Sequence, residues 1–150
     1  MERAETLNHS TQTFKVLDEK TKQELLTLGN MFLHASYWYL ALSANAKFLN
    51  LPGFAWAMIE NEKKCKDAAF MIMTFVKDHG GILEFADIAR PKYDENEVTA
   101  EFICRRWDDI ENWLANKITE FTKEFSAEPE IMDLLNNLKA QVKHVYDRTK

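Results

Sequence analysis

Four long stretches of the chain carry apolar side chains at alternating steps of three and four residues, the spacing of one face of an α-helix. These stretches cover about residues 21–50, 52–79, 95–125 and 129–145. In the first stretch the apolar stripe continues without interruption from Leu25 to Leu49. The pattern therefore predicts an all-α fold built from four helices.

The few glycines and prolines mark the ends of these stretches. The chain has four Gly and three Pro, at Gly29, Pro52, Gly53, Gly80, Gly81, Pro91 and Pro129. Proline is favoured in the first turn of a helix and glycine just after the last, so Pro52, Pro129 and Gly80 are expected helix boundaries. Such a low content of Gly and Pro argues against disorder and against a β fold with many turns.

The lengths of the connections predict how the helices are arranged. Short connections at residues 51–53 and 126–128 require two antiparallel pairs. A helix of about 28 residues is roughly 42 Å long, and the fifteen residues of 80–94 can span about 50 Å when extended. The sequence therefore predicts a four-helix bundle over residues 21–150, with one long crossover between helices 2 and 3 and no fifth helix, after a polar lead-in of residues 1–20.

The composition limits the classes of partner and the cellular compartment that we expect for this chain. The 150 residues correspond to one domain, and 24 acidic against 19 basic residues give a net charge of −5, which argues against nucleic acid as a partner. No apolar run reaches the ~18–20 residues of a membrane span, and the N-terminus lacks the apolar core of a secretory signal. Cys65 and Cys104 form no CxxC pair, so we expect a cytoplasmic protein in a reducing compartment, with no membrane partner.

Four short motifs, in order along the chain, resemble the ferritin family. They are Ala35-Ser36-Tyr37-Trp38-Tyr39-Leu40 with Ser43, Leu51-Pro52-Gly53-Phe54-Ala55, Gly80-Gly81 with Asp87-Ile88 and Pro91, and Gln141-Val142-Lys143. Together they make about residues 25–145 similar to a divergent eukaryotic-type ferritin subunit. The resemblance implies a ferritin-like four-helix bundle with one long crossover.

The same resemblance identifies where an active subunit would hold iron. Such subunits use a Glu on each of the first and third helices and a Glu-x-x-His motif on the second, with a supporting Tyr and Gln. No Glu-x-x-His motif occurs in this chain, because the residues three before its four histidines are Thr6, Met31, Val76 and Gln141. The positions that the resemblance assigns to the ligands carry Phe32, Cys65, Ala68 and Trp107. We therefore expect a hydrophobic bundle centre and no ferroxidase activity, so the chain is not expected to be an enzyme.

Three residues near this centre, Cys65, Tyr39 and Gln141, have two interpretations each. Cys65 is either a soft metal ligand or a buried thiol that behaves as a small apolar side chain. Tyr39 and Gln141 occupy the positions of the family's Tyr and Gln. They are either remnants of the catalytic site or a pair that hydrogen-bonds to each other or to a water in the core.

Ferritin subunits without a ferroxidase site still contribute to iron storage through acidic patches on the cavity face of the second helix. Glu60 and Asp67 are the candidate metal residues on this face. Lys63 and Lys64 alternate with them at helical spacing, which predicts a strip of ion pairs that attracts ferric ions poorly. No tightly bound cofactor is expected, and iron is the one metal that the resemblance suggests.

Apolar residues outside the predicted core indicate a partner surface. On the helices these are Leu26, Leu33, Tyr37, Leu40, Trp56, Phe70 and Met73. On the crossover, Leu83 and Phe85 alternate like a short strand and are the candidate interface residues. We expect a homo-oligomer, from a dimer up to a cage, with a catalytic ferritin subunit as a further partner. The absence of a fifth helix argues against a closed cage of 24 subunits.

The leading functional hypothesis is a non-catalytic ferritin-like subunit that forms a homo-oligomeric assembly and contributes to iron storage without ferroxidase activity. The alternative is a ferritin-derived, artemin-like protein with a structural, stress-protective or hydrophobic-ligand-binding role and no role in iron storage. An active ferroxidase is disfavoured because no ligand of the usual set is present.

Overall fold

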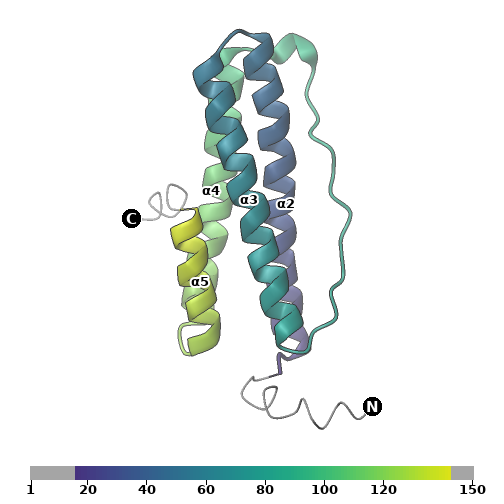
Figure 1. Cartoon of the computed structure of the whole chain (residues 1–150), viewed down its shortest axis with the longest axis vertical. Helices are drawn as coiled ribbons and strands as arrows, with labels where there is room; N and C mark the ends of the chain where they lie inside the picture. The colour runs from purple at the N-terminus through teal and green to yellow at the C-terminus, as the bar shows by residue number, and fades with distance from the viewer. Residues whose placement is uncertain (1–15, 143–150) are drawn as a thin grey trace.

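The computed structural model describes residues 16–142, and all of their regular structure is helical. The elements are α2 (Glu19–Phe48), α3 (Pro52–Asp78), the 3₁₀-helix η1 (Glu95–Glu97), α4 (Ala100–Glu124) and α5 (Pro129–Gln141). Figure 1 shows the four α-helices side by side along the long axis of the molecule. Within the described residues there are four α-helices and no strand, which confirms the predicted all-α class.

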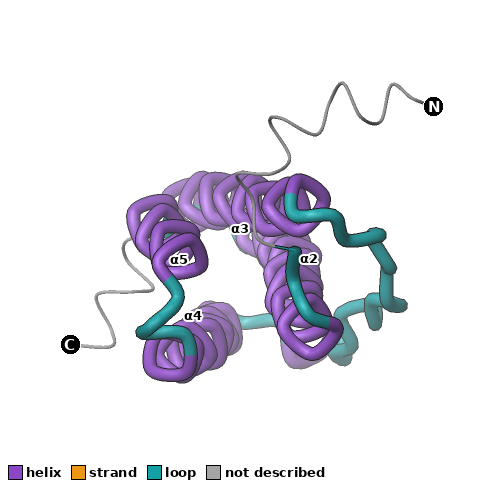
Figure 2. The backbone as a smooth tube through the Cα atoms, turned by 90° about the horizontal axis from the view of Figure 1, so that it is seen from below, coloured by secondary structure: helices purple, strands orange, loops and turns teal. Residues whose placement is uncertain are grey.

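The chain passes along the bundle in the order that the connection lengths predict. α2 and α3 form an antiparallel pair, and the residues after α3 then run beside α2 to the opposite end of the bundle (Figure 1). α4 begins there, so α3 and α4 are parallel, and α5 turns back beside α4. Viewed from the end, the helices occupy four corners, with α2 against α3 and α4, and α5 against α3 and α4 (Figure 2).

Local sequence explains where the helices begin. The Asp18 side chain accepts a hydrogen bond from the backbone N–H of Thr21 at 2.7 Å, which caps α2. Thr99 caps α4 in the same way, with its hydroxyl accepting from the N–H of Phe102 at 3.1 Å. α3 and α5 each begin at a proline, Pro52 and Pro129, as predicted.

The Gly80-Gly81 pair is required where α3 ends. Gly80 has a φ of +84°, in the left-handed region that favours glycine. A Cβ on Gly81 would lie 2.6 Å from Cγ1 of Val76, too close for any other residue at this position without movement. Both glycines therefore serve the sharp turn from α3 into the crossover.

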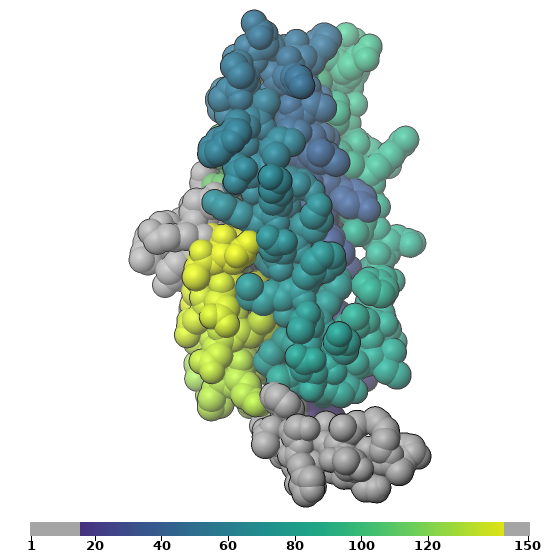
Figure 3. Space-filling view, in the orientation of Figure 1, coloured from purple at the N-terminus to yellow at the C-terminus, as the bar shows by residue number. Residues whose placement is uncertain are grey.

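The core follows the predicted stripes. On α2 the fully buried apolar side chains are Leu25, Leu28, Phe32, Ala35, Tyr39, Leu42 and Ala46. α5, with 13 residues, lies beside the C-terminal part of the 27-residue α3 and does not cover the rest of α3 (Figure 3).

Residues 1–15 and 143–150 lie outside the described part of the chain. Most of the predicted lead-in and the last residues of the fourth stretch therefore lie outside the described residues, and so does the expected lack of a fifth helix.

Two expectations about surface residues are wrong. Leu26 and Met73, expected on an outer face, are buried, because α2 and α3 pack over a face wider than one stripe. In the crossover no strand occurs within the described residues, and the strand-like alternation of Leu83 and Phe85 is not followed. Leu83 packs against the core, whereas Phe85 is 69% exposed. No helix in residues 16–142 has the length and apolarity needed to cross a bilayer.

Candidate functional site

The bundle interior contains three of the four residues at the expected ligand positions. Phe32 of α2 and Cys65 and Ala68 of α3 are all buried, at 0%, 2% and 0% exposure. None of these side chains carries an oxygen or nitrogen ligand for a hard metal ion. The interior between α2 and α3 is therefore apolar at this level of the bundle.

The Cys65 thiol is held in its protonated form. Burial raises the pKa of Cys65 above its ordinary value, and the negative charges of Glu111 and Glu62 raise it further. Metal binding and nucleophilic chemistry both need the thiolate. At neutral pH the Cys65 side chain therefore behaves as a small apolar group, in agreement with the second of its two interpretations. Cys65 and Cys104 are both free cysteines.

On α4 the structure differs from the expectation of a purely hydrophobic centre. Trp107 is only partly buried, and it packs edge-on against Phe54 with ring centroids 6.2 Å apart. Its indole Nε1 donates a hydrogen bond to Oε2 of Glu111 at 2.6 Å. Glu111, one turn further along the helix, is 4% exposed. A buried carboxylate therefore lies in the interior one turn beyond the position predicted for Trp107.

Sequence analysis missed Glu111, although a signal was present. Glu111 lies four residues after Trp107 and three before Leu114, which places it on the apolar stripe of α4. A carboxylate on such a stripe needs a hydrogen-bond donor inside the fold. Trp107 provides this donor, which gives the indole a role beyond filling space.

The donor set around Cys65 does not fit a pair of iron ions. Two carboxylates act on Cys65, those of Glu111 and Glu62. Glu111 accepts from the Trp107 indole, and Glu62 forms an ion pair with Lys66 at 3.2 Å. Among residues 16–142, no group of three or more His, Cys, Asp and Glu side chains is placed to hold a metal ion. Two such ions need several carboxylates together with a histidine directed into the same space.

The remaining predicted residues are dispersed. Tyr39 is fully buried in the core. Gln141, near the end of α5, donates from Nε2 to the backbone carbonyl of Lys64 on α3 at 3.5 Å, which connects the two helices. Glu60 forms a 4.0 Å ion pair with Lys63 on α3, and Asp67 is exposed. The alternation of charge on this face of α3 thus produces an ion pair at Glu60.

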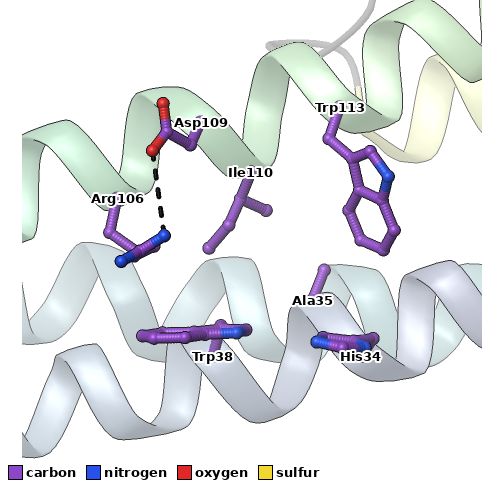
Figure 4. Close-up of a pocket in the computed structure, with 7 residues that line it drawn as sticks. All are labelled: His34, Ala35, Trp38, Arg106, Asp109, Ile110 and Trp113. Carbon is purple, nitrogen blue, oxygen red and sulfur yellow. Dashed lines mark ion pairs between the residues drawn. The ribbon is translucent and has the colours of Figure 1, made fainter. Parts of the chain in front are cut away.

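A second candidate site lies on the surface, where α2 meets α4. A cavity of about 310 Å³ is lined by His34, Ala35, Trp38, Arg106, Asp109, Ile110 and Trp113 (Figure 4). Sequence analysis did not identify this cavity as a site. The α4 residues recur at steps of three and four, so they share one face, but the sequence does not show that this face meets α2. The chain matches no known protein-family profile.

Proposed function

We propose that this chain is a non-catalytic ferritin-like subunit that assembles with copies of itself and contributes to iron storage without oxidising iron. The proposal is supported by the order of the four ferritin-like motifs, which lie on α2, at the start of α3, in the crossover and at the end of α5, where Lys143 lies outside the described residues. It is also supported by the path of residues 79–94, which connect the two pairs along the full length of the bundle (Figure 1). A storage role of this kind depends on compartmentation, with iron made ferric elsewhere.

The observation that carries the proposal is the burial of Phe32, Cys65 and Ala68, which occupy the positions that the resemblance assigns to the ligands of an active subunit. Each large apolar side chain buried there stabilises the fold by about 1.5–3 kcal/mol. Several carboxylates in the same space would be destabilising without a bound cation. Glu111, the buried carboxylate beside this space, accepts a hydrogen bond from Trp107. The interior is therefore a packed core, and it does not require metal for its stability.

Two measurements on the full chain test the proposal. Native mass spectrometry gives the assembly, for which we expect at least a dimer. Ferrous iron added in air should be oxidised no faster than in buffer, while an assembly that stores iron keeps the ferric product in solution. Rapid oxidation that saturates at about two irons per chain, as expected of a di-iron site, would contradict the proposal. An assembly that leaves the iron to precipitate would instead favour a ferritin-derived protein with no iron role.

A restored variant serves as the positive control. Phe32→Glu, Cys65→Glu and Ala68→His together rebuild the ligands of the first two helices, and Glu111 already offers a carboxylate from α4. The variant should be destabilised in the absence of metal and stabilised by it, because buried carboxylates need a cation. Indifference of its thermal unfolding to added metal would show that the positions are assigned wrongly.

A further inference from the structure

The cavity between α2 and α4 is a slot with two walls. On one side the Arg106 guanidinium lies against the Trp38 ring, with Cζ 4.7 Å from the ring centroid. On the other side the Trp113 indole meets the His34 ring edge-on, with centroids 5.6 Å apart and planes at 73°. Figure 4 shows the two wall pairs separated along the helices. One wall is therefore an aromatic ring with a guanidinium stacked on it, and the other is a pair of aromatic rings. In each wall one member comes from α2 and the other from α4.

The floor of the slot is apolar. Ala35 of α2 and Ile110 of α4 lie between the two wall pairs (Figure 4) and are buried. Trp113, in contrast, is 42% exposed, so the slot opens to solvent along its wall. An apolar floor between aromatic walls favours a flat, apolar body, and the volume of about 310 Å³ is at the small end of ligand pockets.

Arg106 gives the slot a positive charge with unused hydrogen-bonding capacity. Its Nε is buried and has no hydrogen-bond partner among the described residues. Its NH1 group lies 3.9 Å from Oδ2 of Asp109, beyond the 2.7–2.9 Å that is typical of a charge-assisted hydrogen bond. The Asp109 side chain is itself 59% exposed, so solvent weakens this ion pair. The guanidinium can therefore donate hydrogen bonds to a second carboxylate.

We propose that this groove binds a small planar aromatic carboxylate. The aromatic ring lies over Ala35 and Ile110, between the walls formed by Trp38 and Trp113. The ligand carboxylate accepts hydrogen bonds from the Arg106 guanidinium, whose planar fork matches a carboxylate in geometry. This binding activity is independent of iron storage, since the residues that line the groove include none of the candidate metal residues.

The probe that tests the proposal is naphthalene-2-carboxylate, with naphthalene-2-carboxamide as its uncharged counterpart. Isothermal titration calorimetry of the full chain at pH 7 should show one carboxylate bound per chain with a Kd of about 1 mM or tighter. The carboxamide should bind about tenfold more weakly, because it lacks the charge that Arg106 recognises. Equal binding of the two compounds, or no binding of either, would overturn the proposal.

Arg106→Gln removes the charge and keeps a polar, though shorter, side chain. It should lower the affinity for the carboxylate about tenfold and leave that for the carboxamide unchanged. Arg105→Gln is the matched control, because Arg105 is the adjacent residue, is 65% exposed and pairs with Glu101 at 2.8 Å away from the groove. An equal loss of affinity in both variants would mean that the carboxylate responds to the overall charge of the protein and not to Arg106, and would overturn the proposal.

Asp109→Asn provides a test that does not disturb the packing of Arg106 on Trp38. Asp109 is largely exposed, so its replacement should leave the fold intact. Because its carboxylate competes with the ligand for Arg106, the variant should bind naphthalene-2-carboxylate about threefold more tightly. Unchanged or weaker binding in this variant would contradict the proposed position of the ligand carboxylate.

Discussion

The interior between α2 and α3 and the seams that join this pair to α4 and α5 are built differently. Between α2 and α3, the interior positions occupied by Phe32, Ala68 and Ile72 are apolar and fully buried. Along the seams, polar groups enter the structure, among them Glu111, His79 opposite Glu130 at 3.6 Å, and Glu24 opposite Glu124. Apolar burial supplies most of the stability in both regions, because one core cluster contains side chains of all four α-helices. The comparison therefore indicates that the seams differ from the first interior by the polar contacts that they add to this core.

The largest effect is expected from a cavity in the apolar region. Phe32→Ala should lower the free energy of unfolding by about 3–5 kcal/mol, because it removes a fully buried ring from a packed core. Urea unfolding followed by circular dichroism measures this change. Tyr37→Ala, at a residue 48% exposed on the same helix, should change the value by no more than about 0.5 kcal/mol. Similar losses in both variants would mean that Phe32 is not in the core.

A smaller loss is expected at the polar contact on α4. Glu111→Ala should destabilise the protein by about 1–3 kcal/mol, because it leaves the Trp107 indole N–H without its acceptor. Glu111→Gln should cost less, since an amide oxygen can accept the same hydrogen bond. The two variants compared by urea unfolding separate the hydrogen bond from the charge. A Gln variant as unstable as the Ala variant would mean that the negative charge itself is required.

The smallest effect is expected where two carboxylates meet at the α2–α4 seam. Partial desolvation and the adjacent Glu124 raise the pKa of Glu24 above 4.5. A raised pKa means that the folded protein binds the proton of Glu24 more tightly than the unfolded chain does. The stabilisation that protonated Glu24 provides is therefore present at low pH and is lost as pH rises through the folded pKa. Glu24→Gln should therefore raise the stability at pH 7 by less than about 0.5 kcal/mol, because solvent screens the repulsion between the two carboxylates, with little effect near pH 4.

Glu19 on the same helix is the control of opposite sign. Hydrogen bonds from Gln23 and Lys22 lower the pKa of Glu19. Its contribution is present above the unfolded pKa and is lost as pH falls through the folded pKa. Thermal unfolding of Glu19→Gln should thus show a lower midpoint than the parent at pH 7 and the same midpoint at low pH. Shifts of the same sign in the Glu19 and Glu24 variants would contradict the assignment of both contacts.

The sequence predicts the helices well because periodicity and helix boundaries are local properties. The stripe from Leu25 to Ala46 is buried as expected, and Pro52, Gly80 and Pro129 mark the observed ends. The burial of Glu111 depends on how α4 is rotated about its own axis against α2 and α3. Steps of three and four residues do not determine this rotation, since Trp107 and Glu111 both fit the stripe.

The groove between α2 and α4 could not be predicted from the sequence for a related reason. It combines His34 and Trp38 of α2 with Arg106 and Trp113 of α4, about 70 residues away along the chain. Each pair has helical spacing, but only packing of the two helices brings them together. The crossover shows the same limit, because the direction of Leu83 and Phe85 is set by contact with the bundle and not by alternation along an unpaired segment.

The composition of the bundle interior can be tested by an anaerobic titration of the unmodified chain with ferrous iron, in which isothermal titration calorimetry measures the binding. With Phe32, Cys65 and Ala68 in the interior, we expect no saturable uptake of iron at two ions per chain. Tight binding of two ferrous ions per chain would contradict this description of the interior.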